Sequence, residues 1–507
     1  MNSNIGDLPD DILVLVLGQA HDAERLGASL GLVAVCRRWR RVGLPVVYRW
    51  AQCGSGSGRA SSVELAAAVG CAGLVRRVGV EAHGAAGLRA AAGTLGRAGA
   101  AGVAELDLAG SDGAGPEGGD LAAAEERDLL LLARAADLLA RAAPGVRRLR
   151  VGAGCGRRLG GRVAAAFARR LQALSCAGPI DVPAGCVFAQ LRSADLACSG
   201  MPPPRIDPRA LRRLRLTGLR PAFAWAPFAA AGGGGGGDDV AEFPALRSLV
   251  LEYAPARKED DDDDDDDDGS SDDGGPVAAL LPAVAHVRVR CAADTCAALG
   301  RARLPAHVDT LDLQLSAAAA QRAALPRARR TALSVGRGDA EAAERVVQRI
   351  MGGRTTAAAA APDPDPRAEE LKLALADPRA GVAPDAVRGA GLTHLAVAAP
   401  TSIGTVAALI AALPALTSAC FTDATLEAAP LDAARDGPLA TRLARLTLGF
   451  GRCRLLRARI VDAAQYLMLR TPSLVRLTAP QVPRPPLESF VRALAAQYPH
   501  LAGIELY

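Results

Sequence analysis

The side chains that could support catalysis or bind a metal are scattered along the sequence. Cys291 and Cys296 stand five positions apart, but no nearby pair of histidines completes a zinc site. The sequence has no P-loop, no G-x-S-x-G nucleophile motif, no H-E-x-x-H motif and no paired C-x-x-C. We therefore expect no catalytic activity in the chain itself, no metal site and no cofactor. The six histidines are His21, His83, His286, His307, His394 and His500.

Pairs of arginines are the side chains best suited to binding another molecule. Alternate residues of a β-strand point to the same face, so arginines two positions apart would lie together on one face. A guanidinium group binds carboxylate or phosphate through two parallel hydrogen bonds, so the pairs predict a surface for an acidic or phosphorylated partner. The alternative is that they are ordinary solvated residues of an arginine-rich chain. The pairs are Arg148 and Arg150, Arg213 and Arg215, and Arg288 and Arg290; acidic residues at equivalent positions are Asp107, Asp195 and Asp312.

A recurring apolar phrase predicts the strands that carry these arginines. The phrase is apolar-x-x-apolar-x-apolar, and fourteen copies run from Val75–Val80 to Leu501–Leu506, with weaker copies around Leu333 and Leu371. Single copies can arise by chance in a chain rich in leucine and alanine. The number of copies, their order and the proline turn that precedes several of them favour a true repeat, with starts commonly 20–31 residues apart.

Alanine-rich segments between the strands predict helices. Val406–Leu413 and Leu487–Ala496 have helical spacing and good helix formers. Small alanine side chains let a helix lie close to a strand layer, and this agrees with an aromatic content of only 3%. The period and the phrase resemble those of leucine-rich-repeat proteins. The resemblance implies an α/β solenoid with parallel strands on its concave side and helices on its convex side.

One feature of the leucine-rich-repeat consensus is missing. The family has asparagine or cysteine shortly after the last leucine of each repeat, whereas this chain has no asparagine beyond Asn2 and Asn4. Cys176, Cys198 and Cys291 lie near the predicted strands without holding that place consistently. We therefore expect irregular turns, as in the repeats of F-box proteins.

The N-terminal segment has a different pattern, which predicts short helices. Pro9 suits the first turn of a helix, Asp7 is a plausible cap, and an apolar stripe follows. A second helix would carry apolar residues up to Trp39 on one face. About 45 residues cannot bury a self-sufficient core, so this segment should leave an apolar face for a partner.

The two halves of this segment, L-P-D-D-I-L from Leu8 and V-C-R-R-W from Val35, resemble an F-box. The alternative, an ordinary cap of the repeats, does not explain the second string. The resemblance implies a three-helix domain that binds a Skp-type adaptor. Its ending departs from the family, because Val47-Tyr48 stands where members often have a Leu-Trp pair. The implied adaptor-binding residues are Leu8, Pro9, Ile12, Leu13, Leu17, Val35, Cys36 and Trp39.

Together the two resemblances imply a substrate-recognition subunit of a Skp–cullin–F-box ubiquitin ligase. The adaptor would connect the chain to a cullin, and the repeats would bind an unknown client protein. One alternative is a scaffold that binds the adaptor without ubiquitin transfer. Another is nucleic-acid binding, against which the few aromatic residues and the interspersed aspartates argue.

The charge is distributed unevenly. The chain carries +5 overall, but residues 259–273 hold 12 acidic side chains, so the remainder carries +17. This acidic run is either a solvated loop or a segment that folds back on Arg288 and Arg290. We predict an F-box domain over residues 1–52 and a repeat array over 53–507, interrupted by disordered loops at about 230–240, 256–276 and 355–367.

Composition also bears on the cellular compartment. The first residues lack the basic region of a signal peptide, and the longest uncharged window, between His394 and Asp423, contains Pro400 and Pro414 and is predicted not to span a membrane. The eleven cysteines are odd in number. We therefore expect reduced thiols and an intracellular protein, cytoplasmic and/or nuclear.

Overall fold

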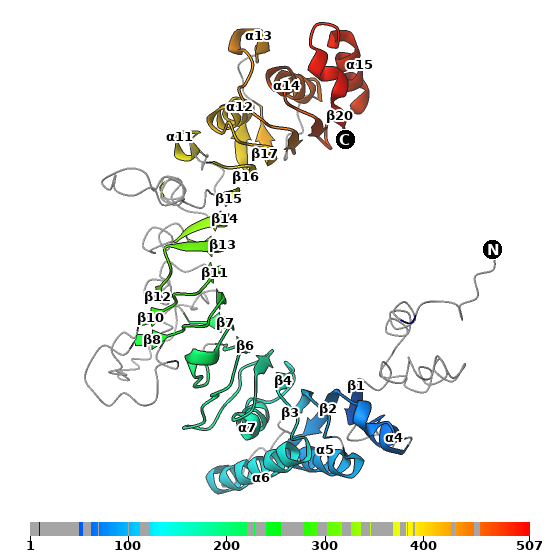
Figure 1. Ribbon diagram of the computed structural model, residues 1–507, viewed down its shortest axis with the longest axis vertical. Coiled ribbons are helices and arrows are strands. Elements are labelled where there is room, and N and C mark those ends of the chain that lie inside the picture. Colours follow the sequence, from blue (N-terminus) through cyan, green and yellow to red (C-terminus); the bar gives the residue numbers. More distant parts are fainter. Residues whose placement is uncertain are drawn as a thin grey trace, which may run out of the picture. The chain divides into compact units, whose positions relative to one another are not determined.

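The computed structural model divides the described residues into two compact units. The first unit comprises residues 1–220 and 225–246, and the second comprises 221–224 and 247–507. Both are α/β, and each contains a solenoid-like stack of parallel strands (Figure 1). The described residues are 10, 50–53, 62–68, 70–99, 101–111, 121–199, 201–220, 225, 228, 240–254, 278–291, 302–316, 326–335, 345, 369–375, 382, 384–388, 391–426, 431–450 and 457–507.

Two of the sequence predictions lie almost wholly outside the described residues. One is the three-helix F-box with its eight adaptor-binding residues. The other is the set of disordered loops at about 230–240, 256–276 and 355–367, of which only residue 240 is described. Both stay predictions.

In the first unit, seven described strands pair in parallel and in chain order. Six of them coincide with predicted copies of the apolar phrase, and β1 does not. Their outward and inward residues alternate, with the phrase's apolar side chains buried. The strands are β1 (Trp50–Cys53), β2 (Arg77–His83), β3 (Glu105–Ser111), β4 (Arg148–Val151), β5 (Ala173–Cys176), β6 (Ser193–Ala197) and β7 (Arg213–Leu219).

Helices cover the inward face of the first strands of this unit. α5 packs on β2 and beside α6, and α6 packs beside α7, as Figure 1 shows. The buried face of α5 includes Ala91, Ala92 and Ala98, so alanine does form the close helix contact that the composition predicts. The helices are α4 (Ser62–Ala68), α5 (Gly84–Ala98), α6 (Leu121–Ala142) and α7 (Arg157–Phe167), and the short 3-10 helices are η3 (Ala72–Leu74) and η4 (Pro208–Ala210).

One close approach in the first unit requires glycine. Gly161 on α7 faces the backbone of Asp181, and a Cβ atom at this position would lie 1.8 Å from the Asp181 carbonyl oxygen. No side chain fits at that distance, so the helix can lie this close to the loop that precedes β6 only because residue 161 is glycine.

The second unit repeats the arrangement with ten described strands, again parallel and in chain order. All ten coincide with predicted copies, including the two weaker ones. They are β9 (Ser248–Tyr253), β11 (His286–Cys291), β13 (His307–Leu315), β14 (Arg327–Val335), β15 (Glu370–Leu375), β16 (His394–Ser402), β17 (Ser418–Thr425), β18 (Arg445–Leu448), β19 (Arg476–Thr478) and β20 (Glu505–Leu506).

Helices and short strands complete the second unit. The predicted helices Val406–Leu413 and Leu487–Ala496 are confirmed as α12 (Ile403–Ala412) and α15 (Arg484–Leu494), each beginning three residues earlier than predicted. One short strand nearby in the sequence, β8 (Val240–Glu242), is part of the first unit instead. The remaining elements are α11 (Pro384–Val387), α13 (Ala433–Asp436), α14 (Arg457–Arg470), η6 (Pro499–Gly503), and the paired strands β10 (Ala278–Leu280) and β12 (Ala302–Arg303).

A backbone ladder connects successive repeats without asparagine. At the start of most strands, one carbonyl accepts hydrogen bonds from two successive amides of the next repeat. Arg192 O accepts from Arg212 N at 2.8 Å and from Arg213 N at 3.1 Å. In the second unit a hydroxyl joins the ladder, since Thr417 Oγ1 donates to Thr393 O at 2.9 Å. The ladder is regular even though the repeat lengths are not.

We call the residues that supply these carbonyls, or that match them in register, the starting row. Their backbone carbonyls or amides make the ladder contacts, so the ladder does not require any particular side chain at these positions. In the first unit the starting row is Arg76, Ala104, Arg147, Gln172, Arg192 and Arg212; in the second it is Arg247, Ala285, Asp309, Arg329, Glu369, Thr393, Thr417 and Ala444.

Candidate functional site

The outward face of the strands, together with the starting row, carries the polar side chains of both units. Strand residues between the buried apolar positions are exposed or half-buried, with the alternation that the sequence predicts. Two hollows lie on this side of the second unit.

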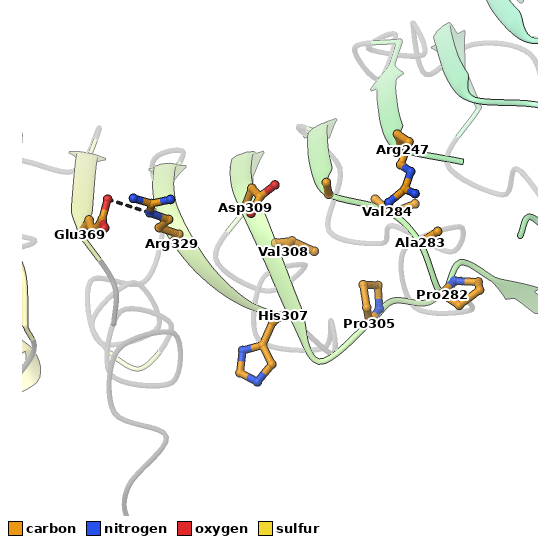
Figure 2. Close-up of a pocket in the computed structure, with 11 residues that line it drawn as sticks. Arg247, Pro282, Ala283, Val284, Pro305, His307, Val308, Asp309, Arg329 and Glu369 are labelled. Atoms are coloured by element: carbon orange, nitrogen blue, oxygen red, sulfur yellow. Dashed lines mark ion pairs between the residues drawn. The ribbon is translucent and has the colours of Figure 1, made fainter. Parts of the chain in front are cut away.

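The first hollow, about 570 Å³, lies along the starting row from β9 to β15. Figure 2 shows Pro282, Pro305 and Val308 on one side, with charged side chains along the strand starts. Arg329 Nε and Glu369 Oε2 form an ion pair at 2.8 Å. The hydrogen bond from Arg329 lowers the pKa of Glu369, so this carboxylate stays charged over a wide pH range.

The second hollow, about 520 Å³, lies on the outward face of the same strands. Its charged side chains are also paired. Arg288 Nε donates to Asp312 Oδ2 at 2.5 Å, and Lys372 Nζ lies 2.8 Å from Glu370 Oε1. The hydrogen bond from Lys372 is the largest cause of a lowered pKa at Glu370. The charged side chains of this hollow are therefore close to electrically balanced.

The second-unit pair of predicted partner-binding arginines is divided by this arrangement. Arg288 forms an ion pair with Asp312, the residue opposite it on β13. Arg290 is exposed, and no described acidic side chain pairs with it. The two arginines therefore do not form a uniformly basic patch.

The first unit has an ion-pair network on β2, β3 and β4. Arg77 Nη2 lies 2.5 Å from Asp107 Oδ2, and Arg150 Nε lies 3.0 Å from Glu105 Oε1. The side chains of Glu105 and Asp107 are only 15% and 22% exposed, and the neighbouring guanidinium groups balance their charges. Arg150, one of the predicted binding residues, is thereby engaged.

The remaining predicted arginines of the first unit differ from one another. Arg215 lies 3.9 Å from Asp195, in a half-exposed pair. Arg148 and Arg213 are exposed, and among the described residues neither has an acidic partner. Of the six predicted arginines, three are thus in ion pairs with acidic neighbours.

Sequence reasoning missed the six arginines of the starting row, which are Arg76, Arg147, Arg192 and Arg212 in the first unit and Arg247 and Arg329 in the second. Arg76, Arg192 and Arg212 are exposed. Arg76 donates only to a backbone oxygen, Gly102 O, at 3.1 Å. These residues hold the second position of the phrase apolar-x-x-apolar-x-apolar. Side chains at the second and third positions both project outward, and the prediction considered only the third.

No disulfide joins the cysteines of the described part, and most of these side chains are buried. Burial raises the pKa of Cys53 to about 12 and that of Cys198 to about 11, so both are protonated at neutral pH. No group of three or more metal-ligating side chains occurs among the described residues. The described helices also include none with the length and apolar character needed to cross a membrane.

Comparison with known proteins adds no relative. No model of a known protein family matches the chain. No curated protein matches it either.

Proposed function

We propose that the chain is the substrate-recognition subunit of a Skp–cullin–F-box ubiquitin ligase. The N-terminal motif binds a Skp-type adaptor through the eight residues named above, and the adaptor connects the chain to a cullin. The parallel-strand array binds a client protein with its outward face. This proposal also implies that the protein works inside the cell.

The observation that carries the proposal is the pairing of two features in one chain. The L-P-D-D-I-L and V-C-R-R-W strings stand before a long parallel array. That array presents rows of exposed charged side chains on a buried apolar core. Such a surface suits protein binding, because its polar residues can change without disturbing the core.

The chain's part in ubiquitin transfer is positional. It raises the local concentration of a bound client near the ubiquitin-carrying enzyme, and the bond chemistry belongs to other subunits. Client binding through the predicted arginines is a separate element of the proposal. Charge reversal at Arg213, Arg215, Arg288 and Arg290 is expected to abolish capture of an acidic or phosphorylated client, and unchanged capture would remove that element.

Pulldown of the tagged full-length chain tests the adaptor function. The wild type is expected to retain a Skp-type adaptor and a cullin, whereas Leu8→Ala/Pro9→Ala loses both. A variant with Arg89→Gln and Arg134→Gln, two exposed positions on helices, serves as the control and should behave as wild type. Retention of the adaptor without a cullin would support the scaffold alternative, and equal retention by both variants would refute the F-box assignment.

A further inference from the structure

On the outward strand face and in the starting row of the first unit, five arginines are exposed and have no acidic partner among the described residues. We call them the arginine surface. Two flank the outward face at β4 and β7, and three belong to the starting row. They are Arg76, Arg148, Arg192, Arg212 and Arg213.

Nearby acids do not neutralise this surface. Over β2–β7 and its starting row, nine arginines face four acidic residues. Glu105 and Asp107 are taken up by Arg77 and Arg150, and Asp195 lies beside Arg215. The fourth acid, Glu81, lies on the far half of β2, 3.9 Å from His83. Six arginines are left without an acidic partner among the described residues. Five of them are the exposed arginines of the arginine surface, and the sixth is the half-buried Arg147, which donates to Pro144 O and Val146 O.

The five arginines are spread along the strands from β2 to β7 rather than gathered around one point. Arg192, Arg212 and Arg213 are contiguous, because both Arg212 N and Arg213 N donate to Arg192 O. Arg148 lies three strands from Arg213 in the same register row, with only Ala173 and Ser193 between them. At about 4.8 Å per strand, the span from β2 to β7 is about 24 Å.

That span fits a segment of extended polypeptide. A chain rising about 3.3 Å per residue covers about 24 Å in roughly seven residues. A single phosphate would meet only one or two of these guanidinium groups. Several carboxylates spaced along a strand would meet most of them, each able to accept two parallel hydrogen bonds.

The surface does not have the features of a single-stranded nucleic-acid site. Such sites stack bases on exposed aromatic rings. The aromatic side chains described in the first unit are buried, as the largest ones, Phe167, Phe188 and Trp225, illustrate.

We infer that the arginine surface binds an extended, carboxylate-rich segment of a protein partner of about seven residues. The segment runs across the strand starts from β7 toward β2. This rests on the proposed function only in that the partner would be the client. Over β9–β15 of the second unit the described charges are closer to balance, because acids pair with Arg288, Arg329 and Lys372.

Fluorescence anisotropy with the full-length chain and a labelled eight-residue peptide of alternating glutamate and serine tests this inference at about 50 mM salt. The triple variant Arg148→Gln/Arg192→Gln/Arg213→Gln is expected to bind about tenfold or more weakly, since each exposed ion pair contributes a few-fold. The control Arg89→Gln/Arg134→Gln/Arg141→Gln changes the net charge equally on the helical side and should change affinity less than about twofold.

Equal weakening by both triple variants would overturn the inference, because binding would then follow net charge alone. Tighter binding of an eight-nucleotide single-stranded DNA than of the peptide would overturn it too. All six positions are exposed, so the variants are expected to fold, and Asp195→Asn supplies a second test that predicts a gain. The assay contains no adaptor, and Leu8→Ala/Pro9→Ala should bind the peptide as wild type does. Failure of the adaptor pulldown and failure of this inference are therefore distinguishable.

Discussion

Removing the negative charge of Asp195 should strengthen binding of the acidic peptide. Asp195 lies on β6, two residues along from Ser193, which is the register partner of Arg213. It is the one acidic residue on β6 and β7, and it repels any carboxylate bound beside these strands. Asp195→Asn keeps the shape of the side chain and removes only its charge.

The expected gain follows from the sheet geometry. One strand across and two residues along places residue 195 about 8 Å from residue 213. With an effective dielectric constant of about 40–80 at this exposed position, two unit charges at that distance interact by roughly 0.5–1 kcal/mol. Affinity should therefore rise about two- to fivefold at low salt.

The effect on stability should be small by comparison. The Arg215–Asp195 pair is 3.9 Å long, and its side chains are 50% and 47% exposed. Such a pair contributes about 0–0.5 kcal/mol. The substitution thus separates binding from folding, which substitution of the more buried Glu105 would not do.

Anisotropy titration at about 50 mM and about 150 mM salt measures this gain, and it should shrink at the higher concentration, where the screening length is about 8 Å. Asp137→Asn, which makes the same charge change at an exposed position on α6, should alter affinity less. Unchanged or weaker binding by Asp195→Asn, or an equal gain from Asp137→Asn, would refute the reasoning.

Three further predictions concern packing, thiol reactivity and the acidic run. Gly161→Ala should lower the free energy of unfolding by about 1–3 kcal/mol in a urea titration, because the added Cβ would meet Asp181 O. The control Gly96→Ala on α5 has open space around the added Cβ and should raise the free energy of unfolding by about 0.5–1 kcal/mol. Equal effects of the two substitutions would contradict the packing. Raising a thiol pKa from 9.0 to about 11 leaves Cys198 about a hundredfold less thiolate at pH 8, so site-resolved alkylation should label it far more slowly in the folded than in the urea-unfolded chain; equal rates would contradict its burial. Deletion of residues 259–273 should raise affinity for acidic partners at low salt if the run screens a basic surface, and no change would exclude screening.

The apolar phrase predicted the strands because burial fixes it. Leu106, Leu149 and Leu174 are all at most 1% exposed, so the sequence must repeat their spacing wherever a strand closes the core. In the missed strand β1, the buried residues among those whose burial is described are Ala51 and Cys53, and their small side chains give almost no periodic signal. The strands β8, β10 and β12, two or three residues long, are too short for any period.

The site was harder to predict because ion pairs depend on register. Arg288 and Asp312 are 24 residues apart, and they meet only because β11 and β13 align them. The sequence could show arginines at two-residue spacing, but it could not show which acids stand opposite. The two-residue spacing also did not predict a binding role for Arg192 and Arg212, because their outward projection depends on the geometry of the strand start rather than on strand alternation.

The starting row explains how one fold can carry two different surfaces. Backbone hydrogen bonds hold that row, so the side chains are free to vary, and the first unit uses this freedom for four arginines. The charge of one of them, Arg147, acts on a neighbour, because the pKa of Arg170 is lowered first by burial and then by the charge of Arg147. Arg170 is held by Ala140 O and by the Phe167 ring, so its own position is structural. Packing therefore accounts for Arg170, whereas the five exposed arginines contact no acidic side chain among the described residues. An acidic partner that offsets their mutual repulsion on binding gives a reason for them to gather on one face.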